Sequence, residues 1–276
     1  MIIIAKIYIY CKIDLIMNEQ ITDAKELLEF YQLAGVDETC GNNPCVLFDN
    51  SIKNTASPMR PATSDLSLSA GAAIQNADNI CSQANSIEEL KKIMEKFEGC
   101  NLKNTATNTV IGDGNPAAKI VFVGEAPGAE EDLAGKAFVG KSGQLLDKIM
   151  ASVGLSRSVV YICNILPWRP PGNRSPSDAE IAVCLPFVKR QIEIIRPDYL
   201  LTLGAIATNS LLGTTETMSH LRGHWLEYQT SDGKNIKTLA TYHPAYLLRT
   251  PAQKNKVWAD FLRFKKEISK NNQQPS

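Results

Sequence analysis

From about residue 105 onward, short apolar runs alternate with longer segments of helical periodicity. The runs at 119–123, 159–166 and 198–204 each have the length of one strand, and amphipathic segments such as 177–195 separate them. Parallel strands need a crossover connection, which is usually a helix. The alternation therefore predicts an α/β fold of three layers, α/β/α, with a central, mostly parallel sheet.

The chain divides into three parts by composition. Residues 1–85 are expected to form an N-terminal extension, with a helix that follows Met17 and a flexible linker rich in Asn, Ser, Ala and Pro from residue 41. Met17 is a candidate for the true start of translation. The main domain is expected over 86–270, and 271–276 form a polar tail.

Composition excludes little about partners but limits the compartment. Lys plus Arg and Asp plus Glu number 29 each, so charge neither supports nor excludes nucleic acid. The seven cysteines are scattered and contain no C-x-x-C, which favours a reducing cytoplasm over a disulfide framework. The apolar opening is interrupted by Lys6, Lys12 and Asp14, so no membrane span is expected.

Three loops follow predicted strands: "GEAPGAEED" at 124–132, "NILPWRPPGNR" at 164–174 and "HPAYLLR" at 243–249. In open α/β sheets, functional groups collect on loops at the carboxyl ends of the strands. The first loop fails as a dinucleotide fingerprint, because G-x-G-x-x-G is missing and Pro127 has no N–H to donate. It also lacks the G-K-[ST] of a phosphate-binding loop, so a plain tight turn stays an open alternative.

Polar and apolar residues in the other two loops have two possible roles each. His243 precedes Pro244 at a rigid corner, and Asn164 is a polar residue inside an apolar strand. Each is either a satisfied structural residue or a ligand-reading group. Leu247 and Leu248 either pack in the core or form an apolar wedge in DNA.

Taken together, the motifs "GEAPGAEEDLAGKAFVGKSGQLLD", "VYICNILPWRPPGNRSPSDAEIAVCLPFVKRQIEIIRP", "LLTLGAIA" and "TYHPAYLLR" resemble the type 4 uracil-DNA glycosylases in order and spacing. The resemblance covers roughly residues 98–268. It implies a DNA-repair enzyme that removes uracil from DNA by cutting the N-glycosidic bond and leaves an abasic site. The implied partner is uracil-containing DNA, and a monomer is expected.

The resemblance also implies roles for pocket residues. Phe138 matches the aromatic residue that stacks on the flipped uracil, and Asn164 matches the residue that reads its edge. His243 matches the histidine that donates to uracil O2 as negative charge develops on the departing base. The turn that lines the uracil pocket comprises Gly124, Glu125 and Ala126.

Two carboxylates are candidates for activating water. Ala126 stands where the best-known branch of the superfamily has an Asp, so Glu125 is the first choice and Asp132 the second. The leucines Leu247 and Leu248 would fill the gap left by the flipped nucleotide, with Arg249 on a phosphate.

The chain departs from the family at the iron–sulfur positions. Most type 4 enzymes hold a [4Fe–4S] cluster on four cysteines, and Cys100 and Cys184 occupy two of these places. Phe97 and Trp168 occupy the other two and cannot donate a thiolate, so no ordinary cluster is expected. No cofactor is needed for the chemistry.

Two alternatives stay open. A protein that binds uracil or abasic DNA without turnover would keep the same pocket. A glycosylase for other deaminated bases is the second alternative, because Gly128 stands where the better-known branch has a bulky residue.

Overall fold

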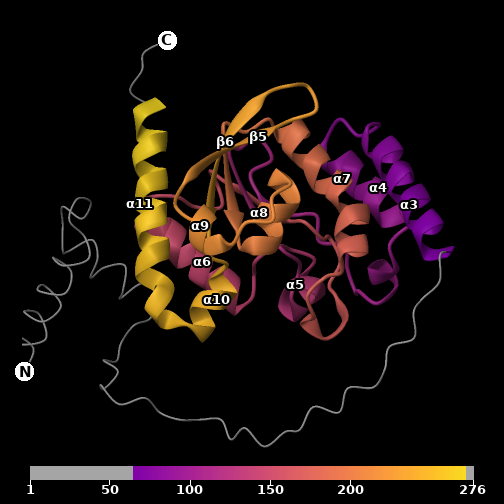
Figure 1. The fold of residues 1–276 in the computed structure, drawn as a ribbon, viewed down its shortest axis with the longest axis horizontal. Coiled ribbons are helices and arrows are strands. Elements are labelled where there is room, and N and C mark those ends of the chain that lie inside the picture. The colour runs from indigo at the N-terminus through magenta and orange to yellow at the C-terminus, as the bar shows by residue number, and fades with distance from the viewer. Residues whose placement is uncertain (1–64, 272–276) are drawn as a thin grey trace, which may run out of the picture.

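A computed structural model describes residues 65–271, and its centre is a six-stranded sheet (Figure 1). The strands are β1 (Asp113–Gly114), β2 (Ile120–Gly124), β3 (Tyr161–Asn164), β4 (Tyr199–Leu203), β5 (Trp225–Gln229) and β6 (Asn235–Thr241). Their order across the sheet is β1-β3-β2-β4-β6-β5. The four central strands pair in parallel, and the edge strands β1 and β5 are antiparallel to their neighbours. The predicted, mostly parallel sheet is confirmed.

The strand order places a switch point beside β2. From β2 the chain moves to β3 on one side, and then to β4 on the other. In sheets of this type the crevice outside the carboxyl ends at such a point binds ligands. The loops after β2 and β3 open at this crevice.

Helices cover both faces of the sheet, as the three-layer prediction requires (Figure 1). The structure contains α3 (Asp65–Cys81), α4 (Ile87–Lys96), α5 (Ala129–Ala134), α6 (Lys141–Ser152), α7 (Asp178–Ile195), α8 (Ala205–Leu212), α9 (Met218–Leu221), α10 (Pro244–Arg249) and α11 (Lys254–Asn271). It also contains the 3-10 turns η1 (Asn101–Asn104), η2 (Pro171–Asn173) and η3 (Pro251–Gln253). Helices α3, α4, α7 and α8 belong to one core, and α6, α10 and α11 to the other.

Strand β2 shows how the sequence produces two cores. Successive side chains of a strand point to opposite faces, so Val121 and Val123 enter the core under α7. Ile120 and Phe122 enter the core under α11, where Phe122 meets Phe261 at 6.0 Å in an edge-to-face pair. Each such side chain contributes about 1.5–3 kcal/mol on burial.

The N-terminal boundary of the domain differs from the prediction. Residues 65–81, expected within a flexible linker, form α3, which packs along α7. Ala77 and Cys81 on this helix and Ala84 after it are buried in the core under α7. The prediction failed because α3 buries small side chains, which give little apolar periodicity. The expected helix after Met17 lies outside the described residues.

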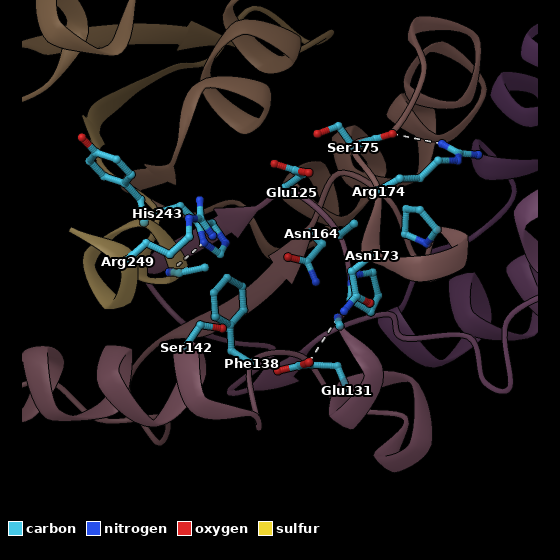
Figure 2. Close-up of a pocket in the computed structure, with 16 residues that line it drawn as sticks. Glu125, Glu131, Phe138, Ser142, Asn164, Asn173, Arg174, Ser175, His243 and Arg249 are labelled. Atoms are coloured by element: carbon cyan, nitrogen blue, oxygen red, sulfur yellow. Dashed lines mark hydrogen bonds between the residues drawn. The ribbon is translucent and has the colours of Figure 1, made fainter. Parts of the chain in front are cut away.

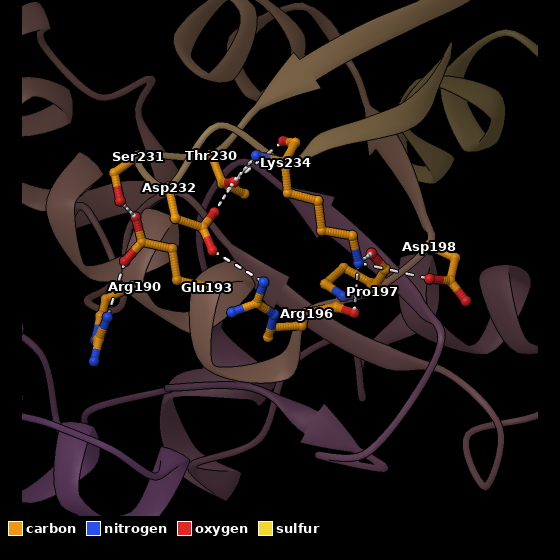
Figure 3. Close-up of polar contacts among 9 residues, drawn as sticks. All are labelled: Arg190, Glu193, Arg196, Pro197, Asp198, Thr230, Ser231, Asp232 and Lys234. Atoms are coloured by element: carbon orange, nitrogen blue, oxygen red, sulfur yellow. Dashed lines mark hydrogen bonds and ion pairs between the residues drawn. The ribbon is translucent and has the colours of Figure 1, made fainter.

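Strands β5 and β6 form an antiparallel hairpin, and polar contacts dock its turn (Figure 3). Ser231 donates to Glu193 at 2.6 Å, and Asp232 pairs with Arg196 at 3.0 Å. Lys234 donates to the carbonyl oxygen of Pro197 at 2.9 Å. These contacts join the turn to the end of α7 at the amino end of β4, the opposite end of the strands from the crevice.

The other long predicted elements are present. The amphipathic segment expected to be helical over 177–195 is α7. Within residues 65–271, every helix is too short or too polar to cross a membrane.

Candidate active site

A cavity of about 440 Å³ lies at the carboxyl ends of β2, β3 and β6 (Figure 2). Its lining comes from three loops that are far apart in the sequence, and from the start of α6. The lining residues are Glu125, Ala126, Pro127, Gly128, Glu131, Phe138, Ser142, Asn164, Pro170, Asn173, Arg174, Ser175, His243, Ala245, Tyr246 and Arg249. The structure therefore brings together the predicted residues Glu125, Ala126, Phe138, Asn164 and His243.

Phe138 forms an aromatic wall of this cavity. Its ring centre lies 5.5 Å from that of His243, with the planes inclined by 35°. The backbone of Phe138 has φ 55°, in the left-handed region, which costs on the order of 1–3 kcal/mol for a bulky residue. A local strain of this kind is kept where the surroundings fix the conformation.

Gly124 allows the aromatic ring and Asn164 to approach the strand end. A Cβ at this position would lie 2.5 Å from Asn164 Oδ1 and 2.5 Å from Phe138 Cζ. Any larger residue would therefore move one of these two side chains. Gly124 therefore contributes to the pocket by leaving room for these two side chains.

Asn164, at the end of β3, presents an unpaired acceptor. The residue is 4% exposed, and its Oδ1 finds no hydrogen-bond partner among the described residues. A buried polar atom without a partner costs about 1–3 kcal/mol, and native proteins keep few of them. The carboxamide thus offers one acceptor and two N–H donors to whatever enters the cavity.

His243 is held in one tautomer. The backbone N–H of Ala245 donates to its Nδ1 at 3.2 Å, so the proton of the neutral ring is on Nε2. Burial, with a smaller effect from the positive charge of Arg249, lowers the pKa of His243 to about 4. The ring is consequently neutral at physiological pH and has an N–H donor available.

Glu125 lines the same cavity as His243 (Figure 2). Its partial burial raises the pKa of the carboxyl group, and the charge of Arg249 opposes this shift. A carboxylate with a raised pKa accepts a proton more readily than an exposed one. The geometry is compatible with a base for a water molecule.

Asp132, the second candidate base, lies outside the cavity lining. The residue is 3% exposed, and its Oδ1 accepts from the backbone N–H groups of Thr107 and Asn108 at 2.8 and 3.0 Å. Two backbone donors already occupy this carboxylate. Its observed contacts are therefore with the segment before β1.

Glu131, the neighbouring acid, lines the cavity instead. Its two oxygens accept from the N–H groups of Gly128 at 3.1 Å and Gly140 at 2.8 Å. The side chain therefore ties the loop after β2 to the start of α6. The sequence indicated an acid cluster here, but the orientation of adjacent acids depends on α5, which is too short to show periodicity.

The two leucines of α10 have different environments. Leu247 is fully buried in the core under α11, whereas Leu248 is 46% exposed. The expectation that Leu247 inserts into DNA is therefore wrong, because its side chain is already packed inside the protein. Leu248 remains available, and Arg249 lines the cavity next to it.

Residues of the proline-rich loop line the cavity without having been singled out from the sequence. They are Pro170, Asn173, Arg174 and Ser175, and Ser142 of α6 joins them. Arg174 forms two hydrogen bonds with Glu180, at 2.6 and 2.9 Å, next to the capping box that begins α7. The motif "PPGNRSPS" is a signal for a loop followed by a helix cap, and could have indicated this wall.

The four iron–sulfur positions of the resemblance hold two thiols and two aromatic rings. Cys184 Sγ donates to Cys100 Sγ at 3.7 Å. Beside them the rings of Phe97 and Trp168 stack at 6.3 Å and 13°, and Phe187 meets both edge-on. Within the described residues, no group of three or more His, Cys, Asp or Glu side chains is placed to hold a metal ion. These residues do not fit a four-thiolate cluster.

Comparisons with known proteins give a family model and several similar relatives. The model of the uracil DNA glycosylase superfamily matches residues 111–262. A type-4 uracil-DNA glycosylase of Archaeoglobus fulgidus is 41% identical over 180 residues, which are 64% of this chain and 90% of the relative. Type-4 uracil-DNA glycosylases of Thermotoga maritima (43%; 59% of this chain, 85% of the relative) and Saccharolobus solfataricus (39%; 64% and 83%) match similarly.

Proposed function

The chain belongs to the uracil-DNA glycosylase superfamily, and we propose that it is a DNA-repair enzyme that excises uracil from DNA. Water hydrolyses the N-glycosidic bond, free uracil leaves, and the DNA keeps an abasic site. The observation that carries this proposal is the unpaired Asn164 Oδ1, buried in a cavity whose opposite side holds a neutral histidine with an available N–H.

Asn164 accounts for the choice of base. Its Oδ1 accepts from uracil N3–H, and its Nδ2 donates to uracil O4. Cytosine presents the opposite pattern, with an acceptor at N3 and an amino group at C4. Binding cytosine would leave buried groups unpaired on both sides, which is a strong form of discrimination.

Phe138 and His243 act on the base once it has left the stack. The phenyl ring provides a stacking surface, which any base can use. His243 donates from Nε2 to uracil O2, where negative charge grows as the bond from C1′ to N1 lengthens. A preorganised donor of this kind favours the transition state over the ground state, and removing one typically costs ~10²–10³ in rate.

Glu125 holds and deprotonates the attacking water. The oxygen of this water bonds to C1′, its proton passes to the Glu125 carboxylate, and the electron pair of the broken bond leaves with uracil. A cationic sugar needs only a weak base, so a carboxylate serves. General-base help is worth ~10²–10⁴ in typical cases.

DNA binding uses the outer rim of the cavity. Leu248 is exposed beside the cavity and fills the space left by the flipped nucleotide, and Arg249 contacts a phosphate. We also propose that the protein works as a monomer in a reducing cytoplasm. The four cysteines in the described part of the chain are all free thiols, which supports such a compartment.

The protein performs this chemistry without an iron–sulfur cluster. The stacked rings of Phe97 and Trp168 fill the space beside Cys100 and Cys184. Iron analysis and the visible charge-transfer absorbance of protein purified without oxygen test this proposal. Stoichiometric iron and sulfide would overturn it.

A gel assay tests the activity itself. Purified protein is incubated with an oligonucleotide that carries one uracil, as single strand and as duplex, and alkali then cleaves any abasic site. We expect cleavage with the wild type and none above background with the Asn164→Ala, His243→Ala double variant. His220→Ala, which removes an exposed histidine outside the cavity, is the matched control and retains activity.

The assay also separates excision from binding. Tight retention of the uracil strand without alkali-labile product would favour a binding protein over an enzyme. Equal cleavage by the double variant would show that the cavity is not the site.

A further inference from the structure

Phe138 has an unusual backbone, and one side chain holds it. Arg157, between α6 and β3, directs its guanidinium group at two consecutive carbonyl oxygens. Nη1 donates to Ala137 O at 3.0 Å, and Nη2 donates to Phe138 O. The peptide groups before and after Phe138, whose φ is 55°, are thereby fixed.

Two carboxylates fix the guanidinium group itself. Nη1 also donates to Asp113 on β1 at 2.6 Å, and Nε donates to Asp147 on α6 at 2.9 Å. Nη2 completes the set with Asp147 at 3.3 Å. All five N–H groups of Arg157 are therefore used, and the side chain is 24% exposed. A planar fork with five donors suits this arrangement, and an ammonium group does not.

Close packing around Phe138 restricts the conformation of its backbone. A Cβ at Gly143 of α6 would lie 1.8 Å from Phe138 O, so the helix approaches the carbonyl group closely. On the far side the ring reaches Gly124, where a Cβ would lie 2.5 Å from Phe138 Cζ. Small rotations at residue 138 would therefore move the ring relative to His243.

We propose that Arg157 is a positioning residue for base excision. It never touches the base, but it holds the 137–138 backbone so that the phenyl ring of Phe138 stays beside His243 as a stacking surface. The inference rests on the proposed function and adds a residue to it that lies outside the cavity lining. A purely structural role, as an ion pair between β1 and α6, is the alternative that the experiment must exclude.

The test compares two arginines with similar surroundings. Arg190 on α7 also donates to a carbonyl oxygen, Ala84 O at 2.7 Å, and to a carboxylate, Glu193 at 3.0 Å. Its side chain is 23% exposed, close to the value for Arg157, and it lies in the layer of α3 and α7. The substitutions Arg157→Lys and Arg190→Lys both keep the positive charge, but they remove the planar guanidinium group with its five N–H donors.

Excision kinetics with a uracil-containing duplex then distinguish a positioning role of Arg157 from a purely structural one. Stacking on an aromatic ring is worth on the order of 10- to 100-fold per base. We expect Arg157→Lys to lower kcat/KM by about 10-fold, because part of this stacking is lost. Arg190→Lys should stay within about twofold of the wild type, because Arg190 and its partners Ala84 and Glu193 lie outside the cavity lining.

A double-variant cycle shows whether Arg157 acts through Phe138. In a Phe138→Leu background the stacking surface is already gone, so Arg157→Lys should change kcat/KM by less than about twofold. Independent losses that multiply, or full activity of Arg157→Lys alone, would overturn the proposal.

A spectroscopic measurement keeps the inference separate from the proposed function. Phenylalanine ring signals of labelled protein are recorded by NMR, and Phe138 is assigned by its loss in Phe138→Leu. A shift of the Phe138 signals in Arg157→Lys, and not in Arg190→Lys, supports the positioning role even if the wild type releases no uracil. Unchanged Phe138 signals in Arg157→Lys would contradict it.

Discussion

His243 uses its two ring nitrogens for two purposes. Nδ1 accepts from the backbone N–H of Ala245, which leaves the proton on Nε2. The pKa of His243 is lowered from 6.5 to about 4, so between these values the ring is neutral in the folded protein and charged in the unfolded chain. The ring therefore contributes stability that is present above pH 6.5 and is lost as the pH falls toward 4.

The pH dependence of excision distinguishes Glu125 from His243. Burial raises the pKa of Glu125 above its usual value, and the base works only when ionised. We expect kcat/KM to fall at acidic pH, as this carboxylate is protonated. The Glu125→Gln variant should lose this acidic fall of the pH–rate profile, and its rate should be lower by about 10²–10⁴-fold. Single-turnover rates from pH 4.5 upward measure both effects.

The same pH–rate profile tests the protonation state of His243. Because its pKa is near 4, His243 should add no step around pH 6.5. A change of rate near pH 6.5 that persists in Glu125→Gln would mean that His243 gains and loses a proton in this pH range. That result would contradict its role as a neutral donor.

Gly124 leaves room for the side chains of Asn164 and Phe138, and a larger residue should disturb them. In Gly124→Ala the new methyl group would lie 2.5 Å from both Asn164 Oδ1 and Phe138 Cζ, so at least one side chain must move. We expect kcat/KM for uracil excision to fall by 10²-fold or so, since a misplacement of about 1 Å costs that much. Gly71→Ala, where a Cβ meets nothing within 4 Å, is the matched control and should be neutral.

The sequence predicted residue types better than side-chain directions. Asn164 and His243 lie at strand ends, where the parallel-sheet rule places functional groups, and both line the cavity. Adjacent residues could not be distinguished in this way. Glu131 lines the cavity and Asp132 contacts Thr107, because a helix turns by about 100° per residue and α5 has only six residues.

At the scale of elements, α5 and α6 are joined by one carboxylate. Glu131 accepts from Gly128 and Gly140 N–H groups, and so connects the loop after β2 with the start of α6. Ser142, which lines the cavity, lies two residues beyond this contact. The shape of the pocket wall thus depends on a residue that need not contact the base.

Glu131→Gln should weaken this connection. The amide group retains one acceptor oxygen, so one backbone N–H is left facing an NH₂ group. We expect the free energy of unfolding to fall by about 1–3 kcal/mol, the cost of an unsatisfied buried group. Chemical denaturation measures it, and Glu130→Gln, at an exposed position one residue earlier, should change it by less than about 0.5 kcal/mol.

Long elements were predictable, and short ones were not. Strands β2, β3 and β4 are buried along their whole length, which makes them visible in the sequence as continuous hydrophobic segments. β1 has two residues, and its place is set by pairing with β3 and by Arg157, which holds Asp113. Such elements depend on tertiary contacts that local patterns do not contain.

For the whole molecule, α3 redefines where the domain begins. Ala77, Cys81 and Ala84 fill the core under α7, and Arg190 on α7 donates to Ala84 O at 2.7 Å. The boundary expected from composition, at residue 86, would remove all of these contacts.

Two truncated chains test this boundary. A chain that begins at residue 86 should unfold at a lower temperature than one that begins at residue 65, because removing α3 exposes apolar surface of α7. The loss should exceed about 2 kcal/mol, the scale of one or two buried side chains. Equal melting temperatures would show that α3 adds nothing to the core.

The proposed activity depends on a cavity that selects uracil over cytosine by the edge that Asn164 reads. The direct measurement is release of free base, by mass spectrometry, from duplexes that carry one uracil or one cytosine. We expect the wild type to release uracil and not cytosine, and Asn164→Ala to lose at least ~10²-fold in rate, because the buried hydrogen bonds cannot form. Release of cytosine at the rate of uracil, or full activity of Asn164→Ala, would contradict this selection.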